Sequence, residues 1–150
     1  MIDDPTGTVT AEAEADAPRG AVARTRRAHY RTEVNLRDRH SLVADEPVEL
    51  GGGDEGPTPF DLLCAALGSC ITITVRMYAD RNGWPLDEVT ARVEHQRRGT
   101  GSGSREEMEV SLSLAGRLTG EQRARLTEIA TRCPMHRTLA GGVAITVHPG

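Results

Sequence analysis

The chain has 150 residues, a length that suits one domain, and 37% of them are hydrophobic although only 3% are aromatic. Because small aliphatic side chains bury less area per residue than aromatic ones, we expect a second copy of the chain to complete the core as a homodimer. The formal net charge is −4 and all 18 basic residues are arginines, a balance that argues against a general nucleic-acid-binding protein.

Residues 1–20 are acidic and rich in small side chains, which predicts a disordered tail ahead of a folded domain at 21–150. This tail has no apolar stretch of the kind found in a secretory signal, so we expect a cytoplasmic protein. No apolar run is both long and uninterrupted enough to suggest a membrane partner.

The first regular pattern alternates through residues 29–36 and predicts a strand with Tyr30, Thr32, Val34 and Leu36 on one face. A turn at Asp38–Arg39 leads to a second short strand at residues 41–45. Residues 46–57 form a glycine-rich segment without the ending of a phosphate-binding loop. Its glycines either allow tight turns or shape a pocket.

A long helix follows, with Thr58 as its cap, Pro59 in its first turn and Gly83 just beyond its end. Its centre is apolar almost all round, which predicts a helix buried on every side. Alternating residues at 88–96 and 107–115 predict two strands of a hairpin.

A capping-box pattern at Thr119–Gln122 opens a second helix, whose inward face carries Leu126, Ile129, Ala130 and Cys133. Residues 143–147 predict a final strand. This order of strands, central helix, hairpin, helix and strand predicts an α+β fold with a mainly antiparallel sheet.

The three cysteines carry the chemical signal. Cys64 and Cys70 lie six residues apart on the predicted helix, so they point to different sides and cannot form a disulfide. Cys64 is typical of a core thiol. Cys70 follows Gly68 and Ser69, which leave room beside the sulfur, but the residues alone also allow an inert core cysteine.

The residues alone leave three roles for Cys133: a core residue, a resolving thiol or a metal ligand. A metal site would need Cys133 and His136 joined by Cys70 and His95, a set that lacks the usual C-x-x-C spacing. A serine hydrolase is not supported, because no G-x-S-x-G turn occurs.

The run GGGDEGPTPFDLLCAALGSCITITVRMYADRNGWPL, followed by RCPMHRTLAGGVAITV, resembles the OsmC/Ohr superfamily over roughly residues 29–147. The stretch VRMYADRNGWPL is similar to the general OsmC-like branch. The resemblance implies an OsmC-like fold, with mainly antiparallel sheets packed around a long central helix in an intertwined homodimer. It also implies active sites at the subunit interface.

The same resemblance implies that Cys70 is the reactive cysteine and Cys133 the resolving one. In the Ohr pattern a glutamate follows the proline of an N-P-E segment and orients a catalytic arginine. Phe60 stands at that position here, with Asp61 one residue later. Arg37 is the best match to the arginine, with Arg31 and Arg39 as rivals.

The expected function is therefore a thiol-dependent peroxidase that reduces organic hydroperoxides through a Cys70 sulfenic acid and a Cys70–Cys133 disulfide. An external dithiol would reduce that disulfide, and no cofactor or metal is expected. The alternative is a non-catalytic, stress-associated protein of the same fold that binds a small molecule.

Overall fold

The computed structural model describes Gly20–Arg27 and His29–Gly150. The chain divides into two compact units, Met1–Thr58 and Pro59–Gly150, and each is described by itself. The expected disordered tail lies outside the described residues except for Gly20. The boundary between tail and domain therefore stays a prediction.

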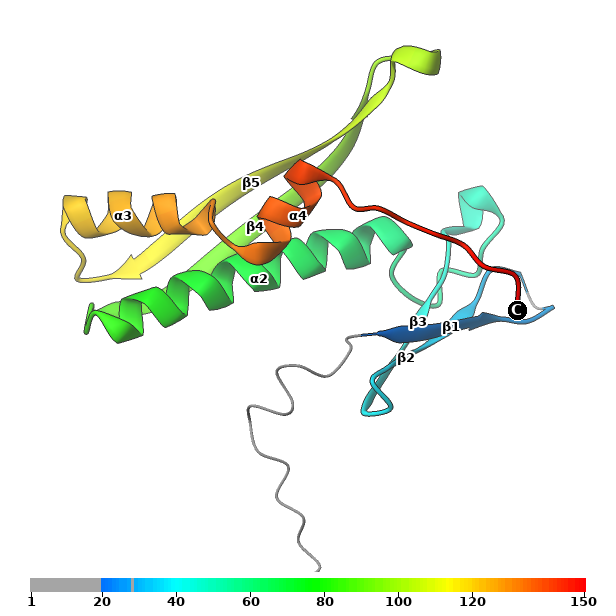
Figure 1. Cartoon of the computed structure of the whole chain (residues 1–150), viewed down its shortest axis with the longest axis horizontal. Helices are drawn as coiled ribbons and strands as arrows, with labels where there is room; N and C mark the ends of the chain where they lie inside the picture. The colour runs from blue at the N-terminus through cyan, green and yellow to red at the C-terminus, as the bar shows by residue number, and fades with distance from the viewer. Residues whose placement is uncertain (1–19, 28) are drawn as a thin grey trace, which may run out of the picture. The chain divides into compact units, whose positions relative to one another are not determined.

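The first unit is a three-stranded antiparallel sheet of β1 (Ala21–Thr25), β2 (Thr32–Leu36) and β3 (His40–Ala44), with β2 in the middle (Figure 1). Along β2 the odd and even positions alternate between half-buried and exposed, as predicted. The sequence reading missed β1 because every one of its residues is exposed, so it has no hydrophobic period.

The turn between β2 and β3 is built on two residues in the left-handed region, Arg37 and Asp38, each with φ of 55°. The side chain of Asn35 accepts the backbone N–H of Asp38 at 2.9 Å. This turn confirms the predicted hairpin and presents the Arg37 side chain from a constrained backbone.

A buried carboxylate holds the glycine-rich segment in place. Asp45 is 2% exposed and accepts the backbone N–H groups of Glu46, Gly53 and Glu55 at 2.8, 3.1 and 3.2 Å. A Cβ at Gly56 would lie 2.1 Å from the carbonyl oxygen of Val43. The glycine here therefore serves a close backbone approach, which supports the tight-turn reading of this segment.

We expect Asp45→Asn to lower the urea midpoint at neutral pH, because an amide nitrogen cannot accept the donated N–H groups. Burial raises the pKa of Asp45, but the three N–H donors and the charge of His29 outweigh it and hold that pKa below its ordinary value of 3.8. The ionised carboxylate of Asp45 thus stabilises the fold at pH values above 3.8. Its contribution to the free energy of unfolding is lost as the pH falls through the lowered pKa. The difference between the two proteins should shrink in acid, and equal midpoints at pH 7 would contradict the assignment.

The second unit contains the long helix α2 (Pro59–Arg81) and the hairpin of β4 (Leu86–Arg98) and β5 (Arg105–Gly116). A short 3-10 turn, η2 (Gly101–Gly103), closes the hairpin; a similar turn, η1 (Val48–Leu50), belongs to the first unit. Helix α2 packs on β4 and also contacts α3 (Gly120–Ala130) and α4 (Pro134–Gly141), as Figure 1 shows. The hairpin is as predicted, and in its register Val93 lies opposite Val110.

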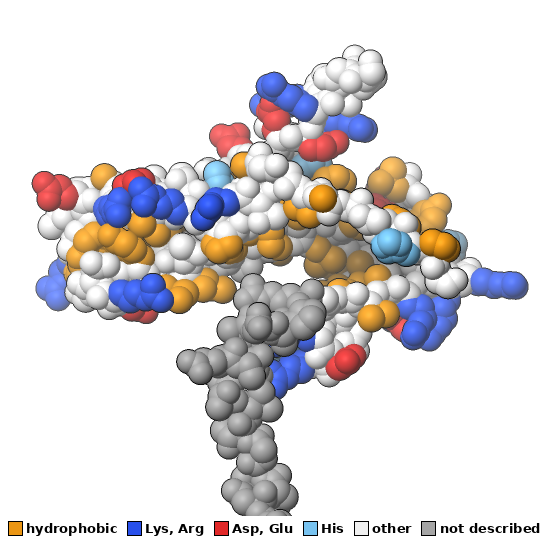
Figure 2. All heavy atoms as spheres, viewed as in Figure 1, with side chains coloured by type: hydrophobic (Ala, Val, Ile, Leu, Met, Phe, Trp, Pro, Cys, Tyr) orange, Lys and Arg blue, Asp and Glu red, His pale blue; other side chains and the backbone are white. Residues whose placement is uncertain are grey.

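Helix α2 is buried on one side only, which corrects the expectation of a helix enclosed all round. Its buried residues recur every fourth position, and they are Leu67, Ile71, Val75 and Ala79. On another face Ile73 is 58% exposed and Met77 47% exposed. Figure 2 shows hydrophobic side chains at the surface of this unit. The single chain therefore leaves part of an apolar helix uncovered.

The same helix corrects a second expectation. By length and composition Pro59–Arg81 could cross a membrane, and little of its apolar window is buried within the chain. The core helix of a folded protein meets the same criterion, so this finding carries no membrane assignment by itself.

Cys133 does not lie in the helix that the sequence predicts for it. Thr119 and Gln122 form the expected capping box, but α3 ends at Ala130 and Cys133 becomes the N-cap of α4. The reason is Pro134, which disfavours a helical conformation for the preceding residue and fits the first turn of a new helix. The predicted inward position of Cys133 is nevertheless confirmed, since it is fully buried.

The final strand predicted at residues 143–147 is absent from the described structure. The segment is not hydrogen-bonded into either sheet, and Val143, Ile145 and Val147 are 60%, 83% and 88% exposed. The alternating pattern is present, but a strand also needs a neighbour, and no described segment of the chain supplies one.

We expect Leu126→Ala to destabilise the protein by about 2–5 kcal/mol, because the side chain is fully buried in the core of the second unit and its removal leaves a cavity. Urea unfolding at a fixed protein concentration would measure the loss. Leu50→Ala is the control, since Leu50 is 65% exposed and should change little. Equal effects of the two substitutions would contradict the assigned core.

Candidate functional site

Two thiols from distant parts of the chain meet inside the second unit. Cys70 lies in the middle of α2, and Cys133 begins α4, sixty-three residues later. The Cys70 side chain interacts with that of Cys133 closely enough to raise the pKa of the Cys133 thiol, and both cysteines are free thiols. Cys70 is half-buried against the core cluster and Cys133 is fully buried. The fold thus brings together the pair that the sequence singled out.

The start of α4 surrounds the Cys133 sulfur. Its Sγ atom accepts the backbone N–H of His136 at 3.2 Å. Burial raises the pKa of the Cys133 thiol, and contact with Cys70 raises it further, whereas the N–H groups of His136 and Met135 lower it. The net rise keeps Cys133 protonated at neutral pH, so it is a poor first nucleophile.

Cys64 stands apart from this pair. Burial raises the pKa of its thiol, and the nearby charge of Asp61 raises it further. The space beside Gly68, which the sequence suggested as room next to Cys70, is filled by the hairpin. A Cβ at Gly68 would lie 3.3 Å from the Val93 side chain. Cys64 is half-buried rather than fully enclosed, and its protonated thiol suits the expected inert role.

The second unit contains a cavity of about 510 Å³, whose lining includes neither Cys70 nor Cys133. Helices α2 and α4, the two hairpin strands and the end of α3 line it. Most of the lining is aliphatic, with Leu63, Leu67, Ile71, Met108, Val110, Leu112 and Leu139. Its wall includes Ile71, next to Cys70 in sequence, and His136, whose backbone N–H contacts Cys133. The cavity can therefore hold an organic group, and residues close in sequence to both cysteines line it.

The titratable side chains on this lining are His95, Glu106 and His136. The ring of His95 stacks on Phe60, with centroids 4.1 Å apart, and its Nε2 lies 2.7 Å from the carboxylate of Glu106. Arg97 also pairs with Glu106 at 3.1 Å. Phe60, which replaces the expected glutamate, is thus part of the cavity wall and holds His95 in place.

Arg37 and Asp61 belong to different units, so the fold of each unit by itself does not test their expected roles. Asp61 lies in the first turn of α2, about 13.5 Å of helical rise before Cys70, and its charge is felt at Cys64. Arg31, a rival of Arg37, pairs with Glu33 and Glu55. Arg39 also has an interaction partner.

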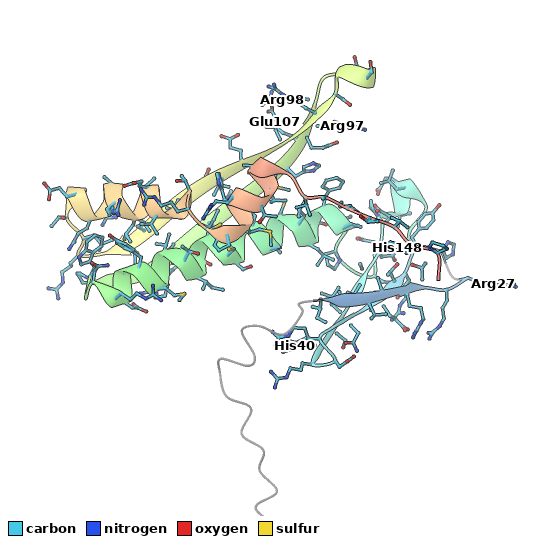
Figure 3. The ribbon with its side chains drawn as sticks, viewed as in Figure 1. Arg27, His40, Arg97, Arg98, Glu107 and His148 are labelled. Carbon is cyan, nitrogen blue, oxygen red and sulfur yellow. The ribbon has the colours of Figure 1, made fainter. Side chains whose placement is uncertain are left out.

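Several arginines of the second unit have structural roles. Arg76 donates to the carbonyls of Leu86 and Asp87, and Arg123 to those of Leu114 and Gly116. On the outer part of the hairpin a cluster of ion pairs joins Arg97, Arg98, Arg105, Glu106 and Glu107, three of which are labelled in Figure 3. These arginines are therefore engaged away from the cysteines.

The metal alternative finds no support in the described part of the chain, where no group of three or more His, Cys, Asp or Glu side chains is placed to hold an ion. The sequence pattern indicated His136 and His95 only as candidate metal ligands, and it gave no sign that both line the cavity. Pro134 was the available signal for His136, since a proline in a first helical turn places the next residues at a helix start.

Comparison with solved structures finds the same fold in proteins of low sequence identity. An OsmC-like protein from Mycoplasma pneumoniae is 18% identical with a TM-score of 0.71, covering 84% of this chain and 89% of that one. An organic hydroperoxide resistance protein from Legionella pneumophila is 23% identical with a TM-score of 0.66, covering 83% and 90%. The organic hydroperoxide resistance protein OhrB of Bacillus subtilis is 19% identical with a TM-score of 0.59, covering 80% and 88%.

No curated protein matches the chain. The sequence profile of OsmC-like proteins matches residues 51–148, which is more than half of the chain and includes both cysteine segments. The chain therefore belongs to the OsmC-like protein family.

Proposed function

We propose that this protein is a thiol-dependent peroxidase that reduces organic hydroperoxides with Cys70 and Cys133. The two free thiols carry the proposal, because Cys70 interacts with Cys133 and a disulfide requires two neighbouring sulfurs. Membership of the OsmC-like family supports it, as do the names of the Legionella and Bacillus proteins.

In the first step the Cys70 thiolate attacks the outer oxygen of the hydroperoxide. An S–O bond forms and the O–O bond breaks, so the sulfur is oxidised by two electrons and becomes a sulfenic acid while the peroxide leaves as an alcohol. Cys133 then attacks that sulfur, and water leaves as the disulfide forms. An external dithiol reduces the disulfide by exchange. The raised pKa of Cys133 argues against it as the first nucleophile and leaves it the second, resolving role.

The cavity supports the choice of an organic hydroperoxide over hydrogen peroxide. Its aliphatic walls would bind an alkyl or aryl group with a gain of roughly 25 cal/mol per Å² of apolar surface buried. Hydrogen peroxide has no such group. Comparable second-order rate constants for hydrogen peroxide and cumene hydroperoxide would contradict this specificity.

Arg37 is proposed to supply the positive charge that favours the Cys70 thiolate, with Asp61 as the residue that orients it. The Arg37 side chain starts from a turn whose backbone is constrained, and a guanidinium stays charged at any relevant pH. We expect Arg37→Gln to slow Cys70 oxidation at pH 7 and to shift its pH profile to higher pH. Asp61→Asn should give a weaker effect in the same direction.

A homodimer is proposed as the working form. Two apolar side chains of α2, Ile73 and Met77, are exposed, and so are the apolar side chains of the unpaired alternating segment ending in Val147. Exposed apolar side chains that form one patch are typical of a surface that binds another chain. A second copy would cover them by supplying the missing strand neighbour. Sedimentation equilibrium should give twice the chain mass, and a monomer at micromolar concentration would contradict the proposal.

The central test counts thiols. Fully reduced protein has three cysteines, and one equivalent of cumene hydroperoxide should consume two of them within one chain and leave Cys64 free. Mass spectrometry of a non-reduced digest should find Cys70 joined to Cys133. A protein that keeps all three thiols would instead be the non-catalytic binding protein of the alternative.

A further inference from the structure

We propose that His136 is the acid that protonates the departing alkoxide when Cys70 reacts with a hydroperoxide. This inference rests on the proposed peroxidase function and names a residue for a step that the cysteines cannot perform alone. Cleavage of the O–O bond leaves an alkoxide, which is far too basic to leave readily without a proton, so a nearby donor should accelerate the step.

The position of His136 carries the proposal. Its backbone nitrogen lies 3.2 Å from the Cys133 sulfur, the Cys133 thiol interacts with Cys70, and His136 also lines the cavity of the second unit. One residue thus contacts the Cys133 sulfur and the space where the organic group would bind. Its position in the first turn of α4, directly after Pro134, fixes the backbone from which the imidazole extends.

The other titratable groups on the lining are less suited to this task. His95 is held between Phe60 and the carboxylate of Glu106, and Glu106 also pairs with Arg97. An ionised carboxylate only accepts hydrogen bonds. Arg37 is proposed to keep its charge for the Cys70 thiolate, and a guanidinium does not release its proton near neutral pH. Cys133 must keep its sulfur for the resolving step. His136 is therefore the proton donor that the cavity lining offers.

In the balanced step, the thiolate and R–O–OH give the sulfenic acid and RO⁻, and the imidazolium of His136 transfers its proton to RO⁻ to give ROH and neutral imidazole. Solvent then restores the proton. Histidine suits such a transfer because its side chain commonly changes charge near neutral pH.

The test compares two oxidants of similar size whose leaving groups differ in their need for a proton. Cumene hydroperoxide releases an alkoxide, whereas perbenzoic acid releases a benzoate that is stable as an anion. We expect His136→Gln to lower the rate constant of Cys70 oxidation by about 10²-fold with cumene hydroperoxide. With perbenzoic acid the loss should be no more than about threefold, since little transition-state stabilisation by the acid is at stake.

Both oxidants react with the same thiolate, so the ratio of the two rate constants cancels any change in Cys70 ionisation. Glutamine keeps the backbone N–H that contacts Cys133. His95→Gln is the matched control, since it alters the other cavity histidine and should leave the ratio unchanged even if both rates fall. Equal losses for the two oxidants in His136→Gln, or no loss, would overturn the assignment of His136.

The same measurements separate this proposal from the one on which it rests. Wild-type protein that loses no thiols to either oxidant would contradict the peroxidase function itself. Wild-type protein that is oxidised normally, with a variant that shows no selective loss, would contradict only the role of His136. His136→Lys should restore part of the reactivity with cumene hydroperoxide, because its side chain can donate a proton, whereas His136→Asn should behave like His136→Gln. Circular dichroism would check that each variant is folded.

Discussion

Cys70→Ser should abolish peroxide consumption, with a fall in rate of at least about 10³-fold, because a serine hydroxyl is not ionised near neutral pH and cannot replace a thiolate nucleophile. The residue is half-buried, and the substitution changes one atom, so the fold should survive. Stopped-flow measurement of cumene hydroperoxide loss against reduced protein would give the rate.

Cys64→Ser is the matched control for that experiment. Cys64 lies on the same helix and is also half-buried, but its thiol belongs to a different face from the sulfur pair. Burial and the charge of Asp61 raise the pKa of this thiol and keep it protonated. The control should therefore retain its activity. A fully active Cys70→Ser protein would end the proposed mechanism.

Cys133→Ser should separate the first chemical step from the second. Oxidation of Cys70 should proceed, but the sulfenic acid should persist because its resolving thiol is absent. Dimedone should then label Cys70, and mass spectrometry would find the adduct on the α2 peptide. Turnover with a dithiol should slow, because the reductant must attack the sulfenic acid directly.

The buried position of Cys133 calls for a second variant. Serine places a hydroxyl where the sulfur is fully enclosed, and such burial costs about 1–3 kcal/mol when the hydrogen bonds are imperfect. Cys133→Ala avoids that cost and should show the same dimedone adduct. Disulfide formation between Cys64 and Cys70 in either variant would contradict the assigned pair, because the two lie on one helix beyond bonding reach.

Local patterns predicted most of the secondary structure. The period of apolar residues indicated the hairpin of β4 and β5, and proline and glycine marked the ends of α2. The errors have physical causes. Strand β1 has no buried face, Pro134 divided the last helix in two, and residues 143–147 lack a neighbour within the described chain.

Part of the candidate site was also readable from the residues. The resemblance to the family indicates Cys70 and Cys133 as a pair with their roles, and in the structure the two side chains interact. The sequence showed that Phe60 stands where the Ohr pattern has a glutamate, but it did not show that the Phe60 ring stacks on His95. Contacts of this kind depend on how β4 packs over α2, which a linear pattern does not encode.

The sequence by itself determined the long helix, the hairpin and the family, because these depend on neighbouring residues and on short motifs. Only the tertiary structure decided that the two thiols interact, that the start of α4 donates a hydrogen bond to one of them, and that an aliphatic cavity forms in the same unit. The physical reason is that Cys133, the N-cap of α4, lies sixty-three residues after Cys70, and the position of α4 is set by packing against α2 in the shared core.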